Sequence, residues 1–270
     1  MRMVCSSHQS MFGMRALVVL PTYNEADNIA EVLRRLRSAV PAADILVVDD
    51  GSPDGTAEIA RAMGAKLGRV DVLTRAGKLG LGSAYRDGFI EGLRGGYQVL
   101  VEMDGDLSHD PAALPGLLRA VDAGADLAVG SRYVSGGSIM HWSARRRALS
   151  RWGNRYAGWM LALPLADATS GFRAYRADVV ARLDLHSIRA DGYGFQIEMA
   201  YRVARAGGEI VEVPIAFVDR RRGASKMSFR IVVEALLLVT WWGLSDLPGR
   251  RRATWSRVPA RSTKAMPTVP

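Results

Sequence analysis

Nine residues near the middle of the chain, Gln98 to Asp106, read Gln-Val-Leu-Val-Glu-Met-Asp-Gly-Asp. Branched apolar residues favour a β-strand, and the apolar run is too short to predict a helix. The run stops at Asp104 and Asp106, and the glycine between them lets the backbone turn sharply. Two carboxylates one residue apart suit Mg²⁺ or Mn²⁺, because such ions bind one or two carboxylates together with substrate phosphates. We therefore expect a short buried strand that ends at a divalent-metal site formed by Asp104 and Asp106.

Two other interpretations of these acids have to be compared with a metal site. Carboxylates that follow a strand are often solvated turn residues. A calcium loop of the EF-hand type would place Asp104, Asp106 and Ser108 at its first three ligand positions. That loop also requires a glycine where the chain has His109 and a bidentate glutamate where it has Pro115. The calcium loop is therefore excluded.

Short apolar runs alternate with helical patterns through the first half of the chain. The runs cover residues 16–20, 45–48, 70–73, 98–103 and 127–129. This alternation predicts a parallel, doubly wound α/β sheet with helices on both faces. Strands covered on both sides are apolar along their whole length, as these are. A further apolar run at 210–217 predicts a strand in the second half.

Polar clusters follow three of these strands. They are Tyr23-Asn24-Glu25, Asp49-Asp50 and Asp104-Gly105-Asp106. The carboxyl ends of parallel strands lie on one edge of the sheet, and open α/β sheets bind their ligands at that edge. The three clusters therefore predict a single binding site.

The segments before the helices carry start signals. Asn24 is a capping residue with Asp27 in the capping-box position, and Ser52 precedes Pro53, which is favourable in a first helical turn. We expect helices to begin at these two points. The glycines of 77–82 have neither the Walker spacing nor a complete dinucleotide fingerprint, so they predict a turn and a helix entry.

The composition limits the classes of protein that fit. The chain has 270 residues, 49% of them hydrophobic, which is enough for a buried core. Its single cysteine, Cys5, excludes an internal disulfide and fits a reducing compartment. The net charge of the chain is +9. Residues 248–270 contain six basic residues and no acid, so the rest of the chain has a net charge of about +3. We expect this tail to be disordered. Residues 1–14, which lack the apolar core of a signal peptide, are expected to form a loose extension.

The second half of the chain has a different character. All six tryptophans lie there, and residues 145–155 carry five arginines and no acid. Residues 231–244 form an apolar run of 14 with one glutamate and the pair Trp241-Trp242. This run is too short to span a bilayer. It predicts either a core helix or an amphipathic helix in the membrane interface, where tryptophan is enriched.

These motifs resemble a known family. Pro21-Thr22-Tyr23-Asn24-Glu25, the run 48–56 and Asp104-Gly105-Asp106 are similar to the nucleotide-sugar half of family 2 glycosyltransferases with the Rossmann-like GT-A fold. Three later motifs, at 192–199, 212–220 and 223–226, resemble the polyprenyl-phosphate (dolichyl-phosphate) mannose synthases. The resemblance implies a GT-A domain at 15–247, with a nucleotide-sugar half at 15–132 and an acceptor half at 133–247.

The resemblance also implies a reaction, the transfer of mannose from GDP-mannose to polyprenyl phosphate with Mg²⁺ or Mn²⁺ as cofactor. It implies that Pro21, Tyr23, Glu25 and Asp50 hold the guanosine, with Asp49 beside them. It places Asp104 and Asp106 at the metal and sugar-phosphate, with Gly105 and Ser108 nearby. It assigns the phosphate contacts to Arg132, Arg220 and Lys226, and the acceptor side to the loop 169–173 with Ser170. The expected catalytic residues are Asp106, Arg132, Arg220 and Lys226.

The chemistry agrees with this set of residues. Departure of a nucleoside diphosphate develops negative charge, which a divalent ion and fixed cations stabilise. A lipid phosphate, whose second pKa is near about 6, is already ionised at neutral pH. We therefore expect no strong general base, and we expect His109 to be a bystander. Direct displacement would invert the anomeric centre.

Two other functions fit parts of the sequence. A polyprenyl-phosphate glucose synthase that uses a UDP-sugar shares some motifs, and the preferred nucleotide sugar separates it from a mannose synthase. A basic nucleic-acid-binding protein would explain the charge, but no aromatic and basic residues interleave on a sheet, so nucleic acid is not an expected partner. We expect a peripheral protein on the inner, cytoplasmic face of a membrane. Helix 231–244 and the basic tail would contact that surface, with or without a membrane-anchoring partner protein.

Overall fold

The computed structural model describes residues 13–188, 190–219 and 229–246. Several predictions fall outside these ranges. They concern Arg220, Lys226, most of the N-terminal extension and the tail 248–270.

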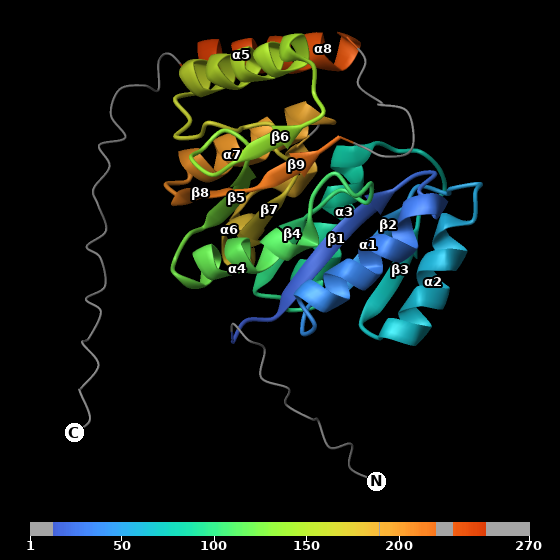
Figure 1. Ribbon diagram of the computed structural model, residues 1–270. Helices are drawn as coiled ribbons and strands as arrows, with labels where there is room; N and C mark the ends of the chain where they lie inside the picture. Colours follow the sequence, from blue (N-terminus) through green and yellow to red (C-terminus); the bar gives the residue numbers. More distant parts are fainter. Residues whose placement is uncertain (1–12, 189, 220–228, 247–270) are drawn as a thin grey trace, which may run out of the picture.

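Seven strands of the described chain form one mixed sheet in the order β3-β2-β1-β4-β7-β5-β8 (Figure 1). The strands are β1 (Ala16–Thr22), β2 (Asp44–Asp49), β3 (Val70–Thr74), β4 (Val99–Glu102), β5 (Leu127–Ser131), β7 (Arg173–Arg176) and β8 (Ile210–Pro214). Neighbouring strands are parallel, except that β7 runs antiparallel between β4 and β5. The prediction of a mostly parallel α/β sheet is confirmed. The sequence did not indicate the inserted strand β7.

Helices cover both faces of this sheet. They are α1 (Ala26–Ala39), α2 (Thr56–Leu67), α3 (Leu81–Arg94), α4 (Leu114–Asp122), α5 (Ala144–Leu161), α6 (Ala177–Arg182), α7 (Tyr193–Arg205) and α8 (Phe229–Ser245), with 3₁₀ turns η1 (Pro111–Ala113) and η2 (Leu185–Ser187). Successive strand side chains point to opposite faces. In β1, Leu17 and Val19 therefore join one core with α3 and α7, while Val18 and Leu20 join a second core with α1 and α4.

Both predicted helix starts are wrong in detail. Asn24 has a left-handed φ of 57° and does not cap α1. The N–H of Ala26 instead donates to Asp54 over 3.1 Å, and the N–H of Glu25 donates to Thr56 over 3.0 Å. Helix α2 begins at Thr56 rather than near Ser52. The reason is that Asp54 and Thr56, which precede or begin α2, accept hydrogen bonds from the backbone N–H groups at the start of α1.

The predicted strand 210–217 is two strands. β8 ends at Pro214, and β9 (Ala216–Val218) pairs with β6 (Ser138–Met140) in a separate two-stranded sheet. Proline has no N–H to continue a ladder. The intervening Ile215 is 3% exposed and packs in the core, so the chain changes sheet at this point.

Helices α5 and α8 lie side by side at one end of the molecule, above α7 (Figure 1). Helix α8 contains the predicted helix 231–244. Within the described ranges, no helix combines the length and the apolar character needed to cross a membrane.

Candidate active site

A cavity of about 490 Å³ opens where the carboxyl ends of β1, β2, β4 and β5 face the start of α7. All three predicted polar clusters contribute to its wall. Of the expected site residues, the cavity is lined by Pro21, Tyr23, Glu25, Asp50, Asp104, Gly105, Asp106, Ser108 and Arg132. Asp49 and Ser170 are not part of that lining.

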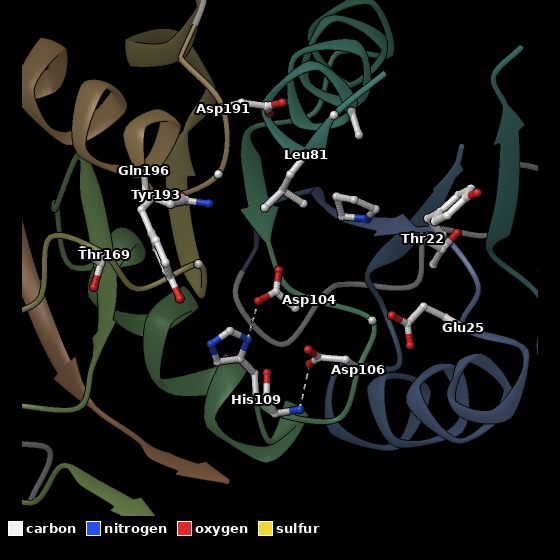
Figure 2. Close-up of a pocket in the computed structure, with 18 of the residues that line it drawn as sticks. Thr22, Glu25, Leu81, Asp104, Asp106, His109, Thr169, Asp191, Tyr193 and Gln196 are labelled. Atoms are coloured by element: carbon white, nitrogen blue, oxygen red, sulfur yellow. Dashed lines mark hydrogen bonds and ion pairs between the residues drawn. The ribbon is translucent and has the colours of Figure 1, made fainter. Parts of the chain in front are cut away.

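Asp104 and Asp106 point into the cavity from the loop after β4, between Glu25 on one side and Tyr193 on the other (Figure 2). Asp106 is 4% exposed, and its carboxylate accepts the N–H of Ser108 over 3.0 Å. Asp104 is more open. The Tyr85 hydroxyl donates to its Oδ1 over 3.2 Å, and the Nδ1 of His109 lies 3.7 Å from its Oδ2. The two acids are therefore held by different neighbours.

This pair fits a divalent ion whose remaining ligands come from substrate. Carboxylate oxygens are the donors that Mg²⁺ and Mn²⁺ prefer. Among the residues that the structure describes, no cluster of three or more histidine, cysteine, aspartate or glutamate side chains is arranged to hold a metal. An ion at Asp104 and Asp106 would need oxygens from a diphosphate and from water, which is how Mg²⁺ is usually bound.

The neighbouring acids Asp49 and Asp50 have different environments. Asp49 is fully buried, and its carboxylate accepts from Thr22 Oγ1 at 2.9 Å and from the N–H and hydroxyl of Ser52 at 2.9 and 2.6 Å. It holds the loop after β2 and does not face the cavity. Asp50 does line the cavity, but Arg75 Nε donates to it over 2.6 Å and the N–H of Leu79 over 3.2 Å. Asp50 therefore also anchors the glycine-rich loop 77–82.

Lys78 lies at the end of the cavity where this loop meets the segment after β1. Its ammonium is 4.9 Å from the centre of the Tyr23 ring, within the range of a cation–π contact. Glu25, which also lines the cavity, accepts from Asn28 Nδ2 over 2.8 Å. An aromatic ring, a cation and a carboxylate thus contribute to this part of the wall.

Arg132 lines the cavity, but its guanidinium is bound to Asp167. Its Nε and Nη2 donate to the two carboxylate oxygens over 2.7 and 2.6 Å, and Nη2 also donates to Thr169 over 2.9 Å. Burial lowers the pKa of Arg132, yet the Asp167 carboxylate outweighs it and raises that pKa above its ordinary value. The pair positions the loop 169–173, in which Ser170 is buried while Thr169 and Gly171 reach the cavity.

A layer of buried polar side chains lies directly beneath the cavity floor. Glu102, at the end of β4, faces Arg173 of β7 in the sheet, and both are fully buried. Burial raises the pKa of the Glu102 carboxyl to about 7, although the charge of Arg173 opposes this. Arg173 donates to the carbonyls of Ala168, Ser170 and Gln196 over 2.6 to 2.7 Å. This arginine therefore ties the loop 169–173 to α7.

A smaller, apolar cavity of about 90 Å³ adjoins the first between α5 and α8. The two share Arg132, Trp142, Arg146, Thr169 and Tyr193. The wall of the smaller cavity also includes Leu149, Trp152, Tyr156, Ile197, Ala235 and Val239. A polar chamber thus meets an apolar groove at a wall that carries two arginines.

Sequence reasoning missed several residues of this site. Tyr85, Lys78, Trp142, Asp191 and Tyr193 were not assigned to it, although the structure brings them to its wall or to Asp104. Tyr193 and Gln196 belong to the motif 192–199, so a signal for them was present. Arg146 stands in an arginine run, and nothing in the sequence distinguishes it from Arg145 or Arg147.

Comparison with known proteins gives a family and near relatives. The model of the family described as "Glycosyl transferase family 2" matches residues 17–184. The chain is 51% identical to an undecaprenyl-phosphate mannosyltransferase of Micrococcus luteus, over 92% of this chain and 99% of that protein. It is 48% identical to a polyprenol monophosphomannose synthase of Mycolicibacterium smegmatis, over 88% of this chain and 90% of that protein.

Among solved structures, the chain is similar to glucosyl-3-phosphoglycerate synthase from Mycobacterium tuberculosis in complex with Mn²⁺, UDP-glucose and phosphoglyceric acid. The TM-score is 0.62 at 22% identity, with 86% of this chain and 79% of that chain covered. At this identity the likeness concerns the fold, and it confirms the glycosyltransferase fold expected from the sequence.

Proposed function

Because the chain belongs to glycosyl transferase family 2, we propose that it transfers mannose from GDP-mannose to a polyprenyl phosphate. The names of the relatives from M. luteus and M. smegmatis support mannose as the sugar and a polyprenyl phosphate as the acceptor. The observation that carries the proposal is the shared wall of the two cavities. A nucleotide sugar requires a polar chamber with carboxylates and cations, and a lipid phosphate requires a cation beside an apolar groove.

The donor would lie along the sheet edge. Tyr23 and Lys78 would contact the nucleoside, and Asp104 and Asp106 would hold Mg²⁺ or Mn²⁺ at the diphosphate. When bound, such an ion stabilises the negative charge that develops on the leaving diphosphate. Arg220 and Lys226, which lie outside the described residues, remain predicted phosphate contacts.

The acceptor phosphate would lie near Arg146. Arg132 is buried and its guanidinium is bound to both carboxylate oxygens of Asp167, whereas Arg146 is half-buried in the wall that both cavities share. Arg146 pairs with Asp219 over 2.7 Å and lies 4.1 Å from the Trp142 ring. An incoming phosphate would replace Asp219 as its partner. The isoprenoid chain would then extend between α5 and α8.

The same geometry suggests how the enzyme reaches its lipid. Helices α5 and α8 expose Trp152, Trp159, Leu237 and Trp241, with the Trp159 side chain 75% exposed. Exposed tryptophans beside arginines are typical of helices that lie in a membrane interface. These exposed residues support peripheral binding to a membrane, and we propose its inner, cytoplasmic face as the location.

The test uses purified protein, vesicles containing polyprenyl phosphate, and labelled GDP-mannose or UDP-glucose with Mg²⁺ or Mn²⁺. Label should pass to lipid from GDP-mannose, and chelation of the divalent ion should stop it.

Asp106→Asn should lower the rate at least about 100-fold with little change in melting temperature, because it removes a charged metal ligand but not its volume. Asp110→Asn, an exposed control after the same strand, should keep the wild-type rate. Transfer from UDP-glucose alone, or normal activity of Asp106→Asn, would overturn the proposal.

A further inference from the structure

Tyr85 is a buried residue of α3 that contacts the floor of the active site. Its side chain is fully buried, and its hydroxyl donates to Oδ1 of Asp104 over 3.2 Å. Its ring stacks on Phe195 of α7, with the ring centres 5.8 Å apart and the planes 11° from parallel. One side chain thus connects α3, α7 and the carboxylate after β4.

Asp104 is the more exposed of the two site carboxylates. It follows the last strand residue, Glu102, by two positions, and its side chain remains 27% exposed. Gly171 packs against it, since a Cβ at that position would lie in ordinary van der Waals contact, 3.5 and 3.6 Å from the two carboxylate oxygens. The Tyr85 hydroxyl at Oδ1 and the His109 ring, whose Nδ1 lies 3.7 Å from Oδ2, therefore restrict the rotation of this carboxylate from two sides.

Contacts on both sides of Tyr85 in the sequence hold helix α3 in place. At its start, the N–H of Gly82 donates to Oδ1 of Asp191 over 2.5 Å, and Arg75 binds the hydroxyl of Ser83. One turn after Tyr85, Gly88 packs so tightly against β1 that a Cβ would come within 2.4 Å of Val19 Cγ1. The helix is packed closely against β1 at this point, so it holds the ring of Tyr85, and with it the hydroxyl, next to Asp104.

We propose that Tyr85 is a positioning residue of the metal site, whose hydroxyl holds Asp104 in the orientation that receives the divalent ion with the donor diphosphate. This inference rests on the proposed function, in which Asp104 and Asp106 bind that ion. Tyr85 itself touches neither metal nor substrate. Its effect is exerted through one carboxylate, so its loss should weaken the metal response and leave metal-independent nucleotide binding unchanged.

Tyr85→Phe tests this directly, because it keeps the stacked ring and removes only the hydroxyl. Tyr175→Phe is the matched control, because Tyr175 is equally buried but its hydroxyl contacts Arg173 and Glu102 rather than a carboxylate that lines the cavity. The measurement is the melting temperature of each protein with excess GDP as Mn²⁺ is added, which requires no turnover. GDP affinity is measured separately in the presence of a chelator.

We expect Tyr85→Phe to need about 10-fold more Mn²⁺ for half of the maximal rise in melting temperature. A decrease in metal affinity of this size is typical when a group that orients a metal ligand is removed. The Mn²⁺ requirement of Tyr175→Phe and the metal-free GDP affinity of both variants should match the wild type. An unchanged requirement in Tyr85→Phe, or an equal increase in Tyr175→Phe, would overturn the inference while leaving the proposed function intact. If the wild type itself shows no Mn²⁺-dependent rise with GDP, the metal-dependent function fails and this inference fails with it.

Discussion

Glu102 is a carboxyl group sealed beneath the active site, and its proton should make the fold sensitive to pH. Burial raises its pKa to about 7 from an ordinary value of 4.5. An acid whose pKa is higher in the folded state holds its proton more tightly when folded, so unfolding releases a proton between these two values. The contribution of Glu102 to the free energy of unfolding should therefore be greatest below about pH 4.5. It should decline as the pH rises, and level off above about pH 7.

Glu102→Gln should remove this contribution while keeping the size of the side chain. A difference of about 2.5 pKa units corresponds to roughly 3 kcal/mol of unfolding free energy. Urea unfolding of both proteins at about pH 5 and about pH 8 measures it. The wild type should lose more stability than the variant over this interval. Parallel losses in the two proteins would mean that Glu102 does not titrate between these pH values.

At the level of single residues, the sequence predicted which side chains lie at the carboxyl-terminal edge of the sheet. It did not predict which of them form hydrogen bonds or ion pairs with one another. Asp49 and Asp50 are indistinguishable in the sequence, yet one holds Ser52 and the other faces the cavity. Arg132 was expected to contact phosphate, and its partner Asp167 is 35 positions away. Such pairs depend on which segments the fold brings together, and no local pattern encodes that.

Among the elements, α8 has two faces, although the sequence treats its tryptophan pair as a unit. Trp241 is 69% exposed, whereas Trp242 packs against the core and stacks on Tyr201, with the ring centres 6.2 Å apart. Adjacent helix residues point about 100° apart, so only one of the two can face the membrane while the other packs on α7.

Single replacements should separate these roles. Trp241→Ser should reduce binding to anionic vesicles even at high salt, because the apolar contact is not screened, and should barely change the melting temperature. Trp242→Ser should instead destabilise the fold by about 3 kcal/mol, as expected for loss of a packed aromatic ring. Vesicle flotation and thermal melting are the two measurements. A destabilised Trp241→Ser with normal flotation would assign both residues to the core.

Strand β7 shows why the sheet was only partly predictable. Its four residues, Arg173 to Arg176, include arginines at both ends, so they lack the apolar character of a central strand. Arg173 is nevertheless fully buried, because it satisfies carbonyls from two other segments. Burial of a charged residue through distant partners conceals a strand from any method based on local hydrophobicity.

Over the whole molecule, the sheet order explains how two halves make one site. Strands β1 and β4 pair directly, and β7 from the later half joins β4 to β5. The polar clusters after β1, β2 and β4 therefore face α7, and the apolar groove under α5 and α8 opens beside them. The common edge of the first strands followed from their parallel pattern. The apolar groove could not be predicted in this way, because it depends on the packing of α5 against α8, two helices about 85 residues apart in the sequence.

The last prediction concerns the charge of the whole chain. Six of the basic residues lie in 248–270, directly after the helix that we place at the membrane. Each basic residue near an anionic bilayer contributes about 1 kcal/mol, and this attraction falls as salt shortens the Debye length to about 10 Å at 0.1 M. Deleting 248–270 should therefore weaken flotation with anionic vesicles at low salt and flatten its dependence on salt.

Flotation with neutral vesicles, which relies on α5 and α8, should be unchanged. Transfer to detergent-dispersed polyprenyl phosphate should also persist, because the tail follows the segments that form the cavity. Identical salt curves for the full and shortened chains would show that the tail does not contribute to membrane binding.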